Sequence, residues 1–77
     1  MEEQLLEIIN KVLENNRKSP LVRLDKKLHL RNDLGFNSFD LAELTVRIEE
    51  KFAVDIFEDG IVSTAAEIIE RIQAKKS

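Results

Sequence analysis

Apolar side chains recur at helical spacing in three stretches of this chain, and this periodicity constrains the fold more than any other feature. In residues 3–16, four of them follow the i, i+3, i+4, i+7 pattern of one helix face: Leu5, Ile8, Ile9 and Val12. Similar patterns occupy residues 38–52 and the chain from residue 64 onward. No segment of useful length alternates apolar and polar residues as a half-buried strand does. The sequence therefore predicts an all-α fold of three helices, with room for a fourth short one.

Local signals indicate where these helices begin and end. The first should end before Pro20, because proline cannot continue a helix. Either Asn37 or Ser38 can cap the second helix. Thr64 and Glu67 have the spacing of a capping box, so the third helix should start at Thr64.

The connections between these helices differ in character. Residues 19–36 form a long first loop that contains several apolar side chains without periodicity: Leu21, Val22, Leu24, Leu28, Leu30 and Leu34. A free linker would be polar, so this loop is expected to pack on the core. Residues 53–62 allow an extended step and one short helical turn before Gly60.

The size of the chain limits the kind of site that it can build. Its 77 residues predict a single domain spanning 1–77, and a domain this small buries only about 60% of the surface of its unfolded chain. Cysteine is absent, which excludes disulfides and thiolate metal sites, and His29 is the only imidazole. The acidic start has no signal-peptide pattern and no apolar run is long enough to span a membrane, so we expect a cytoplasmic protein.

Charge is distributed unevenly along the chain, although the formal net charge is only −3. Residues 17–31 carry six basic residues against Asp25, and residues 32–60 carry eight acids against Arg47 and Lys51. Acid around the second helix argues against nucleic acid binding there and favours a basic partner.

The predicted second helix carries apolar groups on the face that should point to solvent. On a helical wheel, Phe39, Glu43, Val46 and Glu50 lie opposite the core-facing side chains, with Ala42 at the edge. An apolar patch rimmed by charge is typical of a docking surface. The alternative is that Phe39 folds back over the loop onto Phe36 or Leu34.

Ser38 stands at the start of this helix and admits three interpretations. A catalytic nucleophile would need a general base, and the only imidazole lies nine residues upstream in the loop. A plain helix cap is the commonest role of such a serine. If Asn37 is the cap instead, the Ser38 hydroxyl is free, and a phosphate attached to it would lie beside unpaired N–H groups at the positive helix end.

The residues around Ser38 resemble those of an acyl carrier protein. The resemblance rests on the string DLGFNSFDLAEL from Asp33 to Leu44, on RIEEKF from Arg47 to Phe52, and on Val54-Asp55-Ile56. It covers essentially the whole chain and implies a three- to four-helix bundle of the acyl-carrier-protein type with a long first loop. Asp33, Leu34, Gly35 and Asn37 are the motif positions that support Ser38 in this comparison.

The resemblance implies a function and its partners. A separate phosphopantetheinyl transferase (holo-carrier synthase) would move 4′-phosphopantetheine from coenzyme A to Ser38. Acyl or aminoacyl groups would then be attached to this phosphopantetheine arm as thioesters. The carrier itself would have no catalytic residue and no metal, and would be a monomer. Acyl-transferring or condensing enzymes with basic docking surfaces, in fatty acid, lipid or polyketide-like synthesis, would dock at six positions: Phe39, Asp40, Ala42, Glu43, Val46 and Glu50.

Four positions depart from the family pattern. Asn37 replaces the usual aspartate before the serine, Phe39 is bulkier than the usual leucine or methionine, and Arg47 and Lys51 interrupt the acidic helix. Arg47 has the spacing to pair with Glu43 or Glu50.

Two other functional classes remain possible from the residues alone. An unmodified helical adaptor would use the same face of the second helix to bind basic proteins, and would not need Ser38. A nucleic-acid binder would instead use the basic residues 17–31, with strongly salt-dependent affinity.

Overall fold

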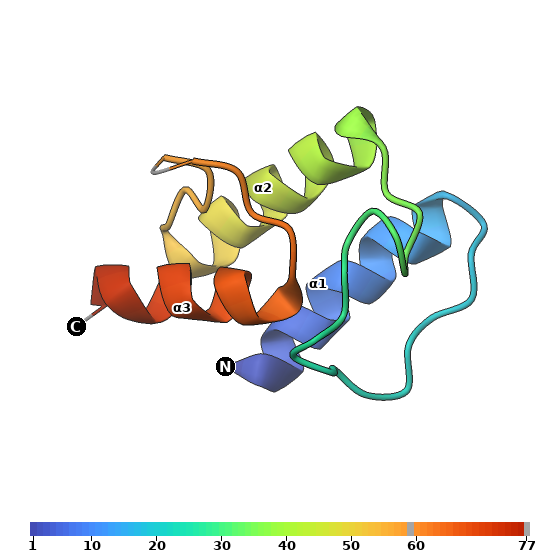
Figure 1. Cartoon of the computed structure of the whole chain (residues 1–77), viewed down its shortest axis with the longest axis horizontal. Helices are drawn as coiled ribbons and strands as arrows, with labels where there is room; N and C mark the ends of the chain where they lie inside the picture. Colours follow the sequence, from blue (N-terminus) through green and yellow to red (C-terminus); the bar gives the residue numbers. More distant parts are fainter. Residues whose placement is uncertain (59, 77) are drawn as a thin grey trace.

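The computed structural model describes residues 1–58 and 60–76 and consists of three helices joined by two irregular connections (Figure 1). The helices are α1 (Glu2–Asn15), α2 (Ser38–Phe52) and α3 (Ala65–Lys76). The described residues contain no strand beyond an isolated antiparallel bridge between His29 and Thr64. The all-α prediction is therefore confirmed, whereas the suggested fourth helix is only a turn at residues 56–58. Asp59, which belongs to the same suggested segment, lies outside the described residues.

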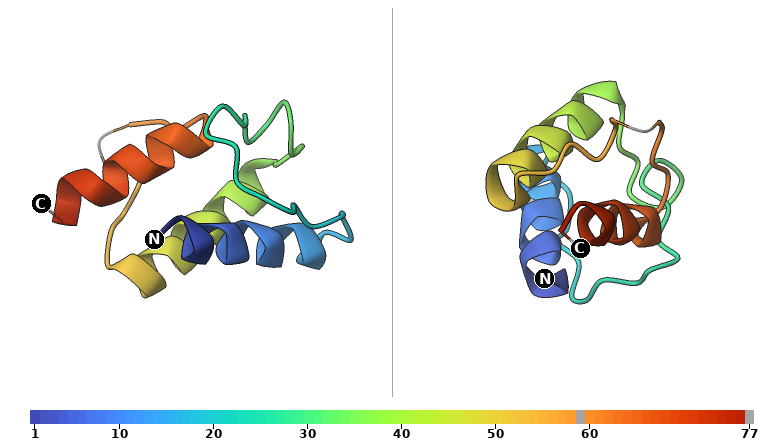
Figure 2. Two further views of the ribbon diagram at one scale, coloured as in Figure 1. Left: turned by 90° about the horizontal axis from the view of Figure 1, so that it is seen from below. Right: turned by 90° about the vertical axis from the view of Figure 1, so that its left-hand side faces the viewer.

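The first two helices pack side by side and run in opposite directions (Figures 1 and 2). The third helix lies against this pair, and the long first loop passes around the other end of the molecule. Both termini lie on the left-hand side of Figure 1, away from the point where the first loop enters α2. The whole molecule measures 34 × 23 × 22 Å.

The core receives side chains from both connections as well as from the helices. The first loop contributes Leu30, Leu34 and Phe36, and residues 53–64 contribute Val54, Ile56 and Val62. Three further leucines of the first loop are partly buried against the core: Leu21, Leu24 and Leu28. The expectation that the first loop packs on the core is correct, except at Val22, which is 96% exposed.

Hydrogen bonds hold both connections against α3. The backbone N–H groups of Ala65 and Ala66 donate to the carbonyls of Leu28 and Lys26, each at 3.0 Å. The Arg71 guanidinium donates from Nη1 to the carbonyl of Ile56 at 2.8 Å. Since buried or half-buried backbone groups must find partners, these bonds explain how irregular chain can cover a small core.

The helix boundaries follow the local signals in the sequence. Thr64 and Glu67 form the predicted capping box: Thr64 Oγ1 accepts from the Glu67 N–H at 3.3 Å, and Glu67 Oε1 accepts from the Thr64 N–H at 3.2 Å. α1 ends at Asn15, and Arg17 turns the chain away with a positive φ of 58°. No helix in the described part of the chain is long and apolar enough to cross a membrane.

Candidate functional site

The start of α2 is capped by Asn37, which leaves the Ser38 hydroxyl free. Asn37 Oδ1 accepts from the Asp40 N–H at 2.9 Å, and Asp40 Oδ2 accepts from the Asn37 N–H at 3.0 Å. Ser38 is therefore the first residue of the helix and is exposed to solvent. None of the described residues makes a hydrogen bond with its hydroxyl. Of the three interpretations of Ser38, the plain helix cap is wrong, because Asn37 performs that role.

The residues before Ser38 form a turn that brings the chain from the core to the surface. Leu34 and Phe36 are buried, while Gly35 between them has a φ of +69°, a conformation that favours glycine. Asp33 Oδ2 accepts from the His29 N–H at 2.7 Å and closes the preceding turn. Each motif position thus has a structural task in placing Ser38.

Asp40 does not belong to the exposed face, and its prediction as a docking residue is wrong. Its side chain is only 5% exposed. One oxygen serves the capping box, and the other accepts a hydrogen bond of 2.6 Å from Nδ2 of Asn16 at the end of α1. A carboxylate enclosed in this way has no free oxygen to offer a partner.

Phe39 points away from the molecule, so the alternative in which it folds back over the loop is also wrong. It is 85% exposed, whereas Phe36 is buried in the core. Val46 is 54% exposed, and Ala42 and Glu50 are exposed on the same helix. The outer face of α2 therefore presents three apolar side chains to solvent, about one helical turn apart: Phe39, Ala42 and Val46.

Glu43 lies at the edge of this face and is already paired within the molecule. Its Oε2 accepts from Nε of Arg47 at 2.9 Å, which is one of the two pairings that the spacing of Arg47 allows. The same oxygen accepts from Nδ2 of Asn15 at 2.7 Å. Because Asp40 is buried and Glu43 is paired, the outer face carries less free negative charge than the sequence indicates.

An open groove of about 390 Å³ begins beside Ser38 and runs between α2 and the second connection. Its apolar lining includes Leu41, Phe57, Ile61 and Val62. Ile61 is 81% exposed at the rim. It was not among the predicted site residues, because it stands in a segment without helical periodicity. The groove gives an attached chain an apolar surface to lie on next to its point of attachment.

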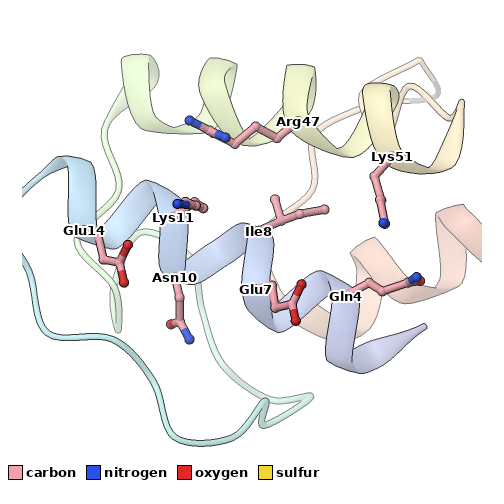
Figure 3. Close-up of a pocket in the computed structure, with 8 residues that line it drawn as sticks. All are labelled: Gln4, Glu7, Ile8, Asn10, Lys11, Glu14, Arg47 and Lys51. Atoms are coloured by element: carbon pink, nitrogen blue, oxygen red, sulfur yellow. The ribbon is translucent and has the colours of Figure 1, made fainter.

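A second groove, of about 420 Å³, lies between side chains of α1 and α2 and does not include Ser38 (Figure 3). Arg47 and Lys51 enter it from α2, and Lys51 points towards α1. The α1 side chains that line it are mostly long and polar, with Ile8 as the apolar exception. Within residues 1–58 and 60–76, no cluster of His, Asp or Glu side chains is arranged to hold a metal ion.

Comparison with known protein families identifies the family of this chain. A family model described as a phosphopantetheine attachment site matches residues 3–72. The chain belongs to this family. Its members are non-catalytic carriers with covalently attached 4′-phosphopantetheine, so this carrier is not an enzyme. No solved structure matched the carrier significantly.

The residues present fit such a group. Formation of a phosphodiester needs an accessible hydroxyl, and Ser38 supplies one that has no partner within the described part of the chain. The N–H groups of Ser38 and Phe39, in the first turn of α2, face the positive helix end where a phosphate is stabilised. When bound, the group supplies a terminal thiol, which a carrier without cysteine lacks.

Three residues at and just beyond the C-terminal end of α1 contact this site, and the sequence indicated none of them. Asn15, Asn16 and Lys18 all make hydrogen bonds to residues in or before the first turns of α2. In the sequence they are visible only as polar residues at a helix end, which carries no information about a distant partner.

Proposed function

We propose that this protein is an acyl carrier that holds its 4′-phosphopantetheine on Ser38. The arm would carry acyl or aminoacyl thioesters and present them to biosynthetic enzymes of fatty acid, lipid or polyketide-like synthesis. The observation that carries the proposal is the Ser38 hydroxyl, which is exposed and has no hydrogen bond with a described residue, because Asn37 and Asp40 cap the helix in its place.

In this proposal residues 1–77 act as a single carrier domain, monomeric and cytoplasmic, whose contribution is local concentration. A substrate tethered to a docked carrier reaches the active site as an intramolecular reactant, so its effective concentration is about millimolar for a short flexible linker. The bundle holds Ser38 in place, and the adjacent groove receives part of the arm or its cargo. The family match favours this carrier over the unmodified helical adaptor.

We propose the outer face of α2 as the docking surface, defined by Phe39, Ala42, Glu43, Val46 and Glu50. Its partners would be the phosphopantetheinyl transferase and acyl-transferring or condensing enzymes with basic docking surfaces. Phe39 supplies the largest exposed apolar group, and Glu50 supplies a carboxylate about three turns further along the same face. Charge would steer the encounter, and burial of Phe39 and Val46 would hold the complex together.

Intact-mass measurement tests the attachment site. The protein is incubated with coenzyme A and a broad-specificity phosphopantetheinyl transferase, beside Ser38→Ala and Ser63→Ala. Ser63 is a matched control because it lines the same groove. Wild type and Ser63→Ala should each gain one phosphopantetheine group, and Ser38→Ala should gain none. Modification of Ser38→Ala, or no modification of wild type under conditions that modify a known carrier, would contradict the proposal.

A further inference from the structure

The C-terminal end of α1 is hydrogen-bonded to the chain on both sides of Ser38. Asn16 reaches forward to Asp40, in the first turn of α2. Lys18 reaches the turn before the helix, where its Nζ donates to the carbonyls of Leu34 at 3.1 Å and Gly35 at 2.9 Å. These contacts join residues far apart in the sequence, and they converge on the segment that presents the proposed attachment site.

We propose that Asn16 and Lys18 are positioning residues for the modification of Ser38. They do not touch the reacting hydroxyl. They determine where the backbone holds it when the transferase docks. This inference rests on the proposed attachment at Ser38, and it adds a role for the segment directly after α1 to a site whose proposed attachment and docking residues lie on α2.

Asn16 acts through a short chain of hydrogen bonds. Its Nδ2 donates both to the carbonyl of Val12 at 2.9 Å, within α1, and to Asp40 Oδ1 at 2.6 Å. The other Asp40 oxygen accepts from the backbone N–H of Asn37, the residue directly before Ser38. Because Asp40 is buried, this carboxylate has little freedom to choose other partners, and the orientation of the Ser38 turn is linked to the position of α1.

Lys18 holds the other side of the junction. Its own N–H donates to the carbonyl of Leu13 at 2.8 Å, which fixes its backbone against α1. Its ammonium group then binds two consecutive carbonyls next to the positive-φ residue Gly35. Hydrogen bonds from a charged donor are stronger than neutral ones, so this contact restrains the turn that leads to Ser38.

These contacts matter for Ser38 because its own hydroxyl has no hydrogen bond with any described residue. The side chain cannot be oriented by a direct partner, so its position depends on the backbone alone. A transferase that docks on the outer face of α2 needs the Ser38 hydroxyl in a constant position relative to that face. The hydroxyl keeps this position only while the turn before Ser38 is restrained. Small displacements of reacting groups cost large factors in rate.

The transferase kinetics of Asn16→Ala, Lys18→Met and a matched control, Asn10→Ala, test this inference. Asn10 is also an asparagine of α1 that anchors the first loop through two hydrogen bonds, from its Nδ2 to the Leu21 carbonyl at 3.0 Å and from the Leu21 N–H to its Oδ1 at 2.7 Å. Both of these hydrogen bonds join Asn10 to Leu21 and not to the Ser38 junction. Thermal unfolding of each variant gives its loss of stability, and kinetics are measured where each is fully folded.

We expect Asn10→Ala and Asn16→Ala to lose similar stability but to differ in kinetics. For Asn16→Ala and Lys18→Met, kcat should fall by about tenfold with little change in KM for the carrier, since docking is intact and orientation is not. Asn10→Ala should keep the wild-type kcat. Lys18→Arg should restore most of the rate, because a guanidinium can also donate to both carbonyls.

Wild-type kcat in both Asn16→Ala and Lys18→Met would overturn the inference while leaving Ser38 as the attachment site. An equal fall in Asn10→Ala would also overturn it, because the effect would then follow stability alone. If Asn16→Ala does not fold, Lys18→Met decides, since its exposed side chain is not part of the core. A wild-type protein that is never modified would instead contradict the proposed function.

Discussion

At the scale of single residues, two positive-φ positions determine how α2 begins and ends. Gly35 has a φ of +69° in the turn that leads to Ser38, and Ala53 has a φ of +57° directly after the helix. Glycine adopts this conformation without steric cost, whereas a residue with a Cβ does not. Gly35 is therefore a favourable residue for its backbone conformation, and Ala53 is an unfavourable one.

Exchanging these residue types should change stability in opposite directions. Ala53→Gly should stabilise the fold and Gly35→Ala should destabilise it, each by about 1 kcal/mol, because the left-handed conformation costs a β-carbon about that much. A Cβ at position 35 would also lie 2.9 Å from the Lys18 ammonium nitrogen, so the lysine would have to move. Denaturant unfolding measures both changes. Changes of the same sign would contradict the conformational argument.

At the scale of the element, α2 uses its two sides and its first turn for different tasks. Leu44, Ile48 and Phe52 are buried in the core, and Asn37 and Asp40 close the first turn. The opposite side is left to Phe39, Ala42, Val46 and Glu50, which are exposed, whereas Glu43 at its edge pairs with Arg47 and Asn15. Substitutions on that side can therefore separate docking from folding.

Phe39→Ala should impair docking without affecting the fold. Because the side chain is 85% exposed, the free energy of unfolding should change by less than about 0.5 kcal/mol. KM of the transferase for the carrier should rise by about tenfold, as expected when a large aromatic contact is removed from an interface.

Val22→Ala is the matched control for this prediction. Val22 is also an exposed apolar side chain, but it lies in the first loop and outside the proposed docking surface. Its substitution should change neither stability nor KM. Equal effects of the two substitutions on KM would show that the docking surface has been placed on the wrong element.

At the scale of the whole molecule, stability depends on a thin core that both connections help to build. A domain of this size has little surplus free energy, so each fully buried side chain carries a large share of it. Ile72 of α3 is fully buried, whereas Ile61 of the second connection is 81% exposed. The two isoleucines thus differ in burial and not in chemistry.

Ile72→Ala should destabilise the protein by about 2–5 kcal/mol, which approaches the whole stability of a small domain. Ile61→Ala should cost less than about 0.5 kcal/mol. Circular dichroism during urea unfolding measures both. Comparable losses would mean that Ile61 packs on the core more closely than its exposure indicates.

The sequence by itself determined the features that depend on neighbours along the chain. Helix α2 begins and ends where its periodicity and caps predict, Thr64 and Glu67 form their capping box, and Arg47 pairs with Glu43 one turn away. These interactions span at most four residues, so their geometry follows from helical spacing alone. The capping box of Asn37 and Asp40 belongs to the same class.

Only the tertiary structure decided which side chains of the site are free. Asp40 and Phe39 are adjacent in the sequence, yet one is buried and the other exposed. Asp40 is enclosed because Asn16, 24 residues away, donates to it, and the Gly35 turn is held by Lys18, 17 residues away. Contacts across such distances depend on how α1 packs against α2, and no local pattern in the chain encodes that packing.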